Sequence, residues 1–153
     1  MQTIAKLNLP DYAFRITKNA DNKLVILDIL RKKNVLLTPE EWVRQNFLKF
    51  LIEEKKYPPS LISVESGVKI NRLCRRYDAM VYNRKGNPVV LIECKAPGVK
   101  IGQETFDQVS AYNLSIKAKY IMVTNGLKHY AVVHNPEQKK FEFISEIPVF
   151  DSL

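Results

Sequence analysis

The sequence predicts a mixed α/β (α+β) fold, with a central mixed β-sheet flanked by helices in the order α-β-β-β-α-β. Segments 78–82 and 89–95 have the apolar character of strands, and turn residues separate them, as in a β-hairpin. Segments with helix start and stop signals lie on both sides of this hairpin. Hydrophobic residues make up 46% of the 153 residues, so the chain can bury a substantial core.

We expect a single domain over 1–153, with an N-terminal β-hairpin extension over 1–37, a core over 38–134, and a C-terminal strand and tail over 135–153. No apolar run is long enough to cross a membrane, and the first residues lack a signal-peptide pattern. Two cysteines are too few for a disulfide framework or a structural zinc site. These features predict a cytoplasmic protein with reduced thiols.

The net charge of +8 favours a polyanionic partner, with nucleic acid ahead of a membrane surface. The alternative is a basic protein that binds neither.

The N-terminal extension is predicted to be β structure. Polar and apolar residues alternate over 12–17, a turn follows at 19–22, and 24–29 is a more buried run. The basic segment 31–34 is expected to form a turn. It either contacts phosphate or is a solvated run of charge.

The first helix is predicted to begin after Thr38. Thr38 can cap it, Pro39 suits the first helical position, and Glu41 completes a capping box. This box also gives Glu41 a purely structural explanation. The helix is expected to continue to about Lys56, because Tyr-Pro-Pro at 57–59 stops it.

Short strands are expected at 61–66 and 68–73, followed by a cluster of arginines just before Asp78. Basic residues beside a metal-binding carboxylate suit a phosphate backbone, although salt bridges to Glu65 or Asp78 would also account for them. We assign nucleic-acid contacts to four basic residues: Arg72, Arg75, Arg76 and Lys100.

The second strand of the central hairpin ends in charged residues. Because side chains two apart share a face of a strand, Glu93 and Lys95 point the same way and Cys94 points to the opposite face. Charges at the end of a buried strand are costly unless they are paired or bound. Asp78, at the start of the partner strand, is expected to lie close to both charged residues.

Two carboxylates on adjacent strands, with a lysine two residues after the second, suit metal-assisted hydrolysis of a phosphodiester. A small number of oxygen ligands suits Mg²⁺, which keeps several waters. The metal lowers the pKa of a bound water, and a lysine can orient that water or stabilise negative charge. The pattern alone also fits a surface ion pair, but the buried strand and the flanking helices favour a metal site.

A second helix is predicted over 103–117, with Gln108 and Tyr112 one turn apart on the same face. Either both line the active-site face, or Tyr112 belongs to the core and Gln108 is exposed. Three further strands complete the fold, at 119–124, 127–133 and 141–144, with turns at 125–126 and 135–136.

These motifs together resemble the PD-(D/E)XK nuclease superfamily and, within it, the N-terminal nuclease domain of type I restriction enzyme R subunits (HsdR). The resemblance covers roughly 38–134 and implies a restriction-endonuclease-like core. Six segments carry it: Thr-Pro-Glu-Glu-Trp-Val-Arg-Gln (38–45), Tyr-Pro (57–58), Arg-Tyr-Asp (76–78), Ile-Glu-Cys-Lys-Ala-Pro (92–97), Gln-Val-Ser-Ala-Tyr (108–112) and Thr-Asn-Gly (124–126).

The resemblance implies that Asp78 and Glu93 ligate Mg²⁺ or Mn²⁺, with the carbonyl of Cys94 as a further ligand. It also implies that Lys95 is the catalytic lysine. Three more residues receive active-site roles in the same way, as the acidic residue of the first helix and the two members of a QxxxY motif: Glu41, Gln108 and Tyr112.

Two features depart from the family pattern. Tyr77 stands where the motif has proline, which is a common variation. R subunits are long ATP-driven motors, whereas no Walker A sequence occurs here, so ATP-dependent translocation is not implied. Residues 1–37 lie outside the match.

The resemblance therefore implies a metal-dependent DNA endonuclease domain of a restriction-modification system, with DNA and other restriction-system subunits as partners and no ATP site. The alternative is a non-catalytic nucleic-acid-binding domain that keeps the nuclease fold within a larger complex. A third possibility is a structural or protein-binding domain. The intact set of motif residues favours the enzyme.

Overall fold

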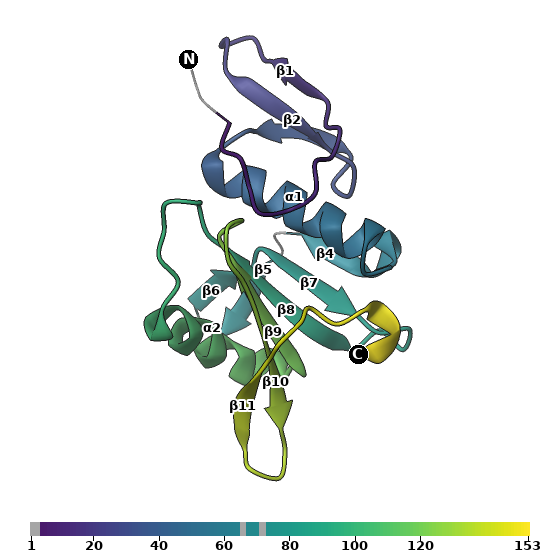
Figure 1. Cartoon of the computed structure of the whole chain (residues 1–153), viewed down its shortest axis with the longest axis vertical. Coiled ribbons are helices and arrows are strands. Elements are labelled where there is room, and N and C mark those ends of the chain that lie inside the picture. Colours follow the sequence, from purple (N-terminus) through teal and green to yellow (C-terminus); the bar gives the residue numbers. More distant parts are fainter. Residues whose placement is uncertain (1–3, 65–66, 71–72) are drawn as a thin grey trace.

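A six-stranded mixed sheet forms the centre of the molecule (Figure 1), in a computed structural model that describes residues 4–64, 67–70 and 73–153. The strand order is β11-β10-β9-β8-β7-β4, and all neighbours are antiparallel except β8 and β9. The strands are β4 (Ile62–Val64), β7 (Ala79–Tyr82), β8 (Pro88–Cys94), β9 (Tyr120–Thr124), β10 (His129–Asn135) and β11 (Lys140–Ile144).

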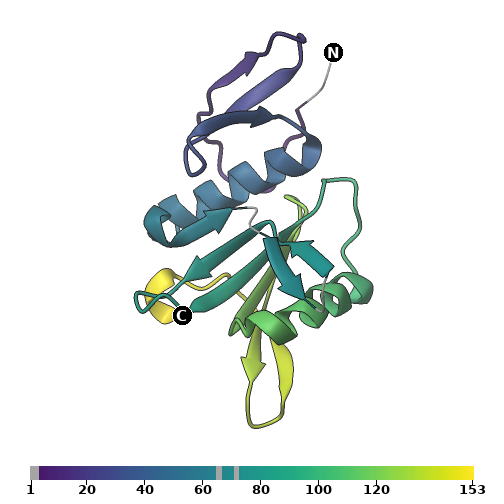
Figure 2. The same ribbon diagram turned by 180° about the vertical axis from the view of Figure 1, so that it is seen from behind.

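Two helices cover opposite faces of this sheet, α1 (Pro39–Glu53) and α2 (Gln103–Ile116). Alternate residues of β8 show the division, because Val90 and Ile92 pack in the core cluster that contains α1, whereas Leu91 packs in the cluster that contains Val109 of α2. Figure 2 shows the molecule from behind, with α2 on the near side of the sheet. The helices and central strands follow the predicted order α-β-β-β-α-β, so the predicted fold class is confirmed.

The start of α1 is as predicted. Thr38 Oγ1 accepts a hydrogen bond from the backbone N–H of Glu41 at 3.0 Å, and Pro39 occupies the first turn. Only half of the capping box forms, because the N–H of Thr38 donates to the carbonyl of Leu36 and the Glu41 side chain bonds elsewhere. The helix ends at Glu53, earlier than predicted, since Lys56 adopts a left-handed conformation that reverses the chain before the prolines.

The N-terminal extension is a three-stranded antiparallel sheet, so the predicted hairpin was incomplete. Its strands are β1 (Ile16–Lys18), β2 (Leu24–Asp28) and β3 (Lys33–Leu36). The predicted turn at 31–34 ends at Lys32, which has a positive φ of 57°, and the chain then pairs with β2. Helix α1 lies between this sheet and the central sheet (Figures 1 and 2).

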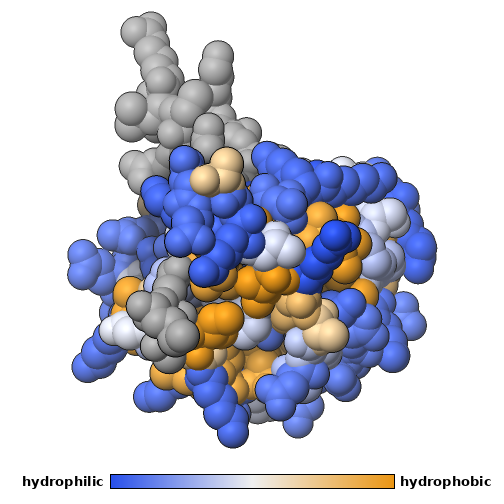
Figure 3. Space-filling model, turned by 90° about the horizontal axis from the view of Figure 1, so that it is seen from above, coloured by the Kyte–Doolittle hydropathy of each residue, from blue (hydrophilic) through white to orange (hydrophobic). Residues whose placement is uncertain are grey.

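The end of the molecule formed by the N-terminal sheet carries hydrophobic as well as hydrophilic surface (Figure 3). Ile29 and Leu36 are among its exposed apolar side chains.

Two strands were predicted between α1 and β7, at 61–66 and 68–73. The described residues of this region form three strands: β4, and then β5 (Gly67–Ile70) paired with β6 (Leu73–Arg76) in a small separate sheet.

The two predicted turns of the core are present. In the β7–β8 hairpin, Asn83 Oδ1 accepts hydrogen bonds from the N–H groups of Lys85 and Asn87, and Gly86 has a positive φ. Asn125 organises the β9–β10 turn in the same way. Among the described residues, no helix has the length and apolarity needed to cross a membrane.

The close packing at Gly126 predicts a difference between two glycine substitutions. Gly86 and Gly126 both have a positive φ, but an added Cβ at Gly126 would lie 2.6 Å from Leu7 Cδ2 and 3.1 Å from Cγ2 of the fully buried Val43, whereas Gly86 has open space. Gly86→Ala should cost about 1 kcal/mol of unfolding free energy, and Gly126→Ala about 1–3 kcal/mol more. Urea denaturation measures both. Equal losses would show that the N-terminal segment around Leu7 does not pack firmly there.

Candidate active site

The β7–β8 hairpin brings two carboxylates together. Ala79 pairs with Ile92 across the hairpin, so Asp78 and Glu93 lie one residue further along the same antiparallel register. Burial, and then the negative charge of Glu93, raise the pKa of Asp78 to about 7. The two carboxylates therefore share a poorly solvated place in which their charges repel.

Asp78 is held on both of its carboxylate oxygens. Oδ2 accepts a hydrogen bond of 2.7 Å from the backbone N–H of Cys94, which joins it to β8. Oδ1 accepts a hydrogen bond of 3.3 Å from Nη1 of Arg44 on α1. The charge of Arg44 and the hydrogen bond from Cys94 both act to lower the pKa of Asp78, against the larger effects of burial and Glu93.

Glu93 is also held on both oxygens. Lys95 Nζ lies 3.2 Å from Oε1, as expected for two side chains on the same face of a strand. The hydroxyl of Tyr112 on α2 donates to Oε2 at 3.2 Å. Lys95 is 28% exposed, so its ammonium group can reach a ligand in solvent.

Glu41 is bound by two arginines, and one of them, Arg44, also contacts Asp78. Its carboxylate accepts hydrogen bonds from Arg44 Nε at 2.8 Å and Nη2 at 2.7 Å, from Arg31 Nη2 at 2.5 Å, and from Gln45 Nε2 at 3.2 Å. Burial would raise the pKa of Glu41, but the hydrogen bonds and charges of the two arginines hold it below the ordinary value. Among the described contacts, Glu41 is linked to Asp78 through Arg44, which bonds to both carboxylates.

Arg44 is the site residue that the sequence interpretation missed. The arginines just before Asp78 were expected either to contact phosphate or to form salt bridges to Glu65 or Asp78, and their side chains lie outside the described part of the structure. Among the described residues, the cation in contact with Asp78 is Arg44, 34 residues earlier. Glu41 and Arg44 are three positions apart, and such residues are neighbours on one face of a helix. This spacing could have indicated from the sequence that Arg44 pairs with Glu41.

Apart from Cys94, whose backbone N–H bonds to Asp78, the other predicted site residues are not joined to this cluster by a described contact. Gln108 is exposed on α2, one turn before Tyr112, and Lys100 is exposed in the segment between β8 and α2. The thiol of Cys94 is buried on the α1 side, as the strand alternation predicts. Three predicted nucleic-acid contacts lie where the structure gives no side-chain description: Arg72 is outside the described residues, and Arg75 and Arg76 lie on β6.

The donor set fits a hard divalent cation better than zinc. Asp78 and Glu93 offer carboxylate oxygens, and their mutual repulsion is what a cation between them would relieve. In the described parts of the chain, no three His, Cys, Asp or Glu side chains gather closely enough to hold a metal ion. Two carboxylates suit Mg²⁺ or Mn²⁺, which take the rest of their ligands from water and substrate phosphate.

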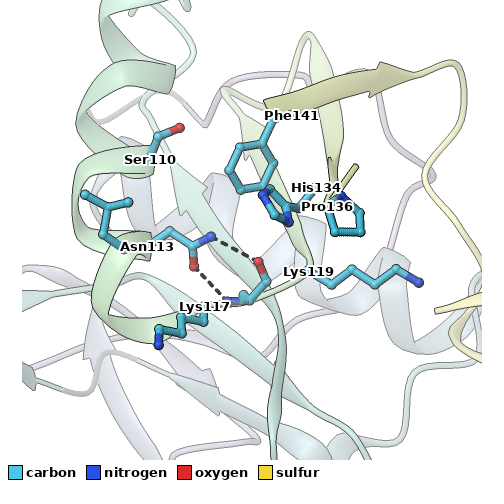
Figure 4. A pocket seen from close by; sticks show the side chains of 9 residues that line it. Ser110, Asn113, Lys117, Lys119, His134, Pro136 and Phe141 are labelled. Atoms are coloured by element: carbon cyan, nitrogen blue, oxygen red, sulfur yellow. Dashed lines mark hydrogen bonds between the residues drawn. The ribbon is translucent and has the colours of Figure 1, made fainter. Parts of the chain in front are cut away.

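Two hollows differ in their relation to this cluster. A groove of about 700 Å³ runs between β3 and the start of α1 and is lined by Arg31, Glu41, Arg44 and Ala96. A hollow of about 480 Å³ lies at the far end of α2, where the Asn113 amide is bonded to the backbone of Ala118 (Figure 4). None of the predicted site residues lines the second hollow, and Asp78 and Glu93 line neither one. We place the candidate site at the two carboxylates because of their contacts with Arg44, Lys95 and Tyr112.

The chain resembles known proteins in sequence family and in fold. The family described as Type I restriction enzyme R protein N terminus (HSDR_N) matches residues 39–148. A fragment assigned to the HsdR subunit of a type I restriction enzyme from Vibrio vulnificus YJ016 has the same fold, with a TM-score of 0.54 and 18% identity. The match covers 75% of this chain but only 24% of that one. No curated protein matches the sequence.

The raised pKa of Asp78 predicts a pH-dependent effect of Asp78→Asn. The folded protein binds a proton that the unfolded chain has lost between about pH 4 and about pH 7, so the wild type loses stability as pH rises through that window. Asparagine has no such loss. The melting temperature of the metal-free variant, relative to that of the wild type, should therefore increase as pH rises. At about pH 8 it should equal or exceed the melting temperature of the wild type.

Differential scanning calorimetry in the presence of a chelator measures this difference. Asp21→Asn, in an exposed turn of the N-terminal sheet, is the control for loss of a carboxylate. A difference between Asp78→Asn and wild type that does not change with pH would contradict the crowding of charge at Asp78.

Proposed function

Because the chain belongs to the family of type I restriction enzyme R protein N termini, we propose that it is a metal-dependent DNA endonuclease domain that hydrolyses phosphodiester bonds. The observation that carries the proposal is the cluster of Asp78, Glu93 and Lys95 at the end of one hairpin. The matched HsdR fragment is much longer than this chain. Since the matching family is that of one protein of type I restriction enzymes, we also propose that other restriction-system subunits act with the domain, in the cytoplasm.

Asp78 and Glu93 would hold Mg²⁺ or Mn²⁺. When bound, the cation supplies positive charge at the phosphoryl oxygens and a water of lowered pKa. The protein's own groups preset the geometry, since Cys94 N–H and Arg44 fix the Asp78 carboxylate, and Tyr112 and Lys95 fix that of Glu93.

Lys95 would act on the substrate directly. Its ammonium group is tethered to Glu93 but partly exposed, so it can donate to a phosphate oxygen or to the attacking water beside the two carboxylates. Affinity for DNA would come from the excess of positive charge, +8 for the whole chain, through contacts to the phosphate backbone. We assign part of this contact to Lys100 and to the arginines Arg72, Arg75 and Arg76.

Lys95→Ala separates catalysis from binding. We expect the variant to lose cleavage of supercoiled DNA in Mg²⁺ or Mn²⁺ and to keep its DNA affinity within about threefold, because many basic side chains share the phosphate contacts. Nicking and gel-shift assays on the same preparations measure both quantities. Equal nicking by wild type and variant would point to a contaminating nuclease. Wild-type protein that binds DNA without cutting it would favour the non-catalytic alternative.

Gln108→Ala tests the outer part of the site. Gln108 is exposed, so its loss should leave the melting temperature unchanged. If Gln108 holds the DNA strand beside Tyr112, the nicking rate should still fall. Gln103→Ala, at the exposed start of the same helix, is the matched control. Identical nicking rates for the two variants would leave Gln108 without a role at the site.

A further inference from the structure

Five charged residues of alternating sign form a path from the N-terminal sheet to Asp78, which is the last of them. Asp28, at the end of β2, accepts a hydrogen bond from Nε of Arg31, and Arg31 Nη2 donates to Glu41 at 2.5 Å. Glu41 binds Arg44 through two hydrogen bonds, and Arg44 Nη1 lies 3.3 Å from Asp78 Oδ1. A continuous path of ion pairs therefore links a β-sheet outside the family match, which begins at residue 39, to a predicted metal ligand.

Little water reaches this path. The side chains of Asp28, Glu41 and Arg44 are 2%, 6% and 8% exposed. Those of Arg31 and Asp78, at 13% each, are only slightly more exposed. Charges with so little solvent depend on their neighbours, because a lost partner leaves a buried charge uncompensated. Removing one member should therefore disturb the position of the next.

The fold of the N-terminal sheet sets the position of Arg31. Asp28 Oδ1 accepts hydrogen bonds from the backbone N–H groups of Leu30 at 2.9 Å and Arg31 at 3.0 Å, which fixes the turn that follows β2. Asp28 itself pairs with Lys33 in the β2–β3 ladder. Arg31 thus reaches Glu41 of α1 from a turn held by two hydrogen bonds to Asp28.

Glu41 is fully occupied by this arrangement. Arg44 binds it in a two-pronged contact, through Nε and Nη2, and this geometry directs the remaining nitrogen, Nη1, towards Asp78. Arg31 and Gln45 occupy the rest of its carboxylate. Glu41 therefore acts on Arg44, and the role of metal ligand or base does not suit it.

We propose that Arg44 and Arg31 are positioning residues for Asp78, and that the N-terminal sheet is thereby part of the catalytic apparatus. Arg44 fixes one carboxylate oxygen of Asp78 while Cys94 N–H fixes the other, so the carboxylate is oriented before any cation arrives. Arg31 acts one step further away, through Glu41. This inference rests on the nuclease function proposed above.

The test compares Arg31→Gln with Arg15→Gln in the full chain. Both variants remove one positive charge from the N-terminal segment, but Arg15 is exposed and outside the path. The readouts are Mn²⁺ affinity, from the electron paramagnetic resonance signal of free Mn²⁺, and the DNA nicking rate. We expect Arg31→Gln to weaken Mn²⁺ binding by about tenfold, as is typical for loss of a residue that orients a metal ligand, and Arg15→Gln to bind like wild type.

Arg31→Lys keeps the charge but replaces the fork that bridges two carboxylates with a single point of contact, so its affinity should be intermediate. It also decides the question if Arg31→Gln does not fold. An Arg31 variant that has a lower melting temperature but binds Mn²⁺ as tightly as Arg15→Gln would overturn the positioning role. Wild-type protein that binds Mn²⁺ but does not cut DNA would overturn the nuclease proposal alone. The Mn²⁺ affinities of the variants would then still decide whether Arg31 helps to position Asp78. Absence of Mn²⁺ binding by wild type would overturn both.

Discussion

Asp78 and Glu93 place two negative charges at the ends of adjacent strands, where burial denies them most of their hydration. The raised pKa of Asp78 expresses the cost of that arrangement. The surrounding groups act to reduce it: a backbone N–H from β8, an arginine from α1, a tyrosine hydroxyl from α2, and the ammonium group of Lys95. In the function proposed here, a divalent cation between the two carboxylates would relieve the repulsion that remains.

The architecture explains why these groups converge. The central sheet is covered by α1 on one face and α2 on the other, so a residue at the end of β7 or β8 is within reach of both helices. Arg44 and Tyr112 approach the carboxylates from these two helices. The N-terminal sheet adds a second support beyond α1, through Arg31 and Glu41. Groups from α1, α2 and the central sheet therefore contact the two carboxylates, and in our proposal the N-terminal sheet supports them through Arg31 and Glu41.

Local patterns were sufficient to predict the elements that carry the site. Strand alternation placed Glu93 and Lys95 on one face, and the capping residue Thr38 located the start of α1. The third N-terminal strand was missed because Lys33 and Asn34 are exposed polar residues, which read as a turn until their pairing with β2 is seen. Arg44 was missed because its contact with Asp78 spans 34 positions, and no local pattern encodes a pairing at that distance. The roles of the site residues remain predictions, since fold and family do not test them.

A crystal structure with Mn²⁺ tests the central claim most directly, because anomalous scattering locates the ion independently of any activity. The account predicts an anomalous peak within ligand distance of carboxylate oxygens from both Asp78 and Glu93, with Glu41 still bonded to Arg44 and Arg31. A peak ligated by Glu41, or one placed away from the β7–β8 hairpin, would contradict the account.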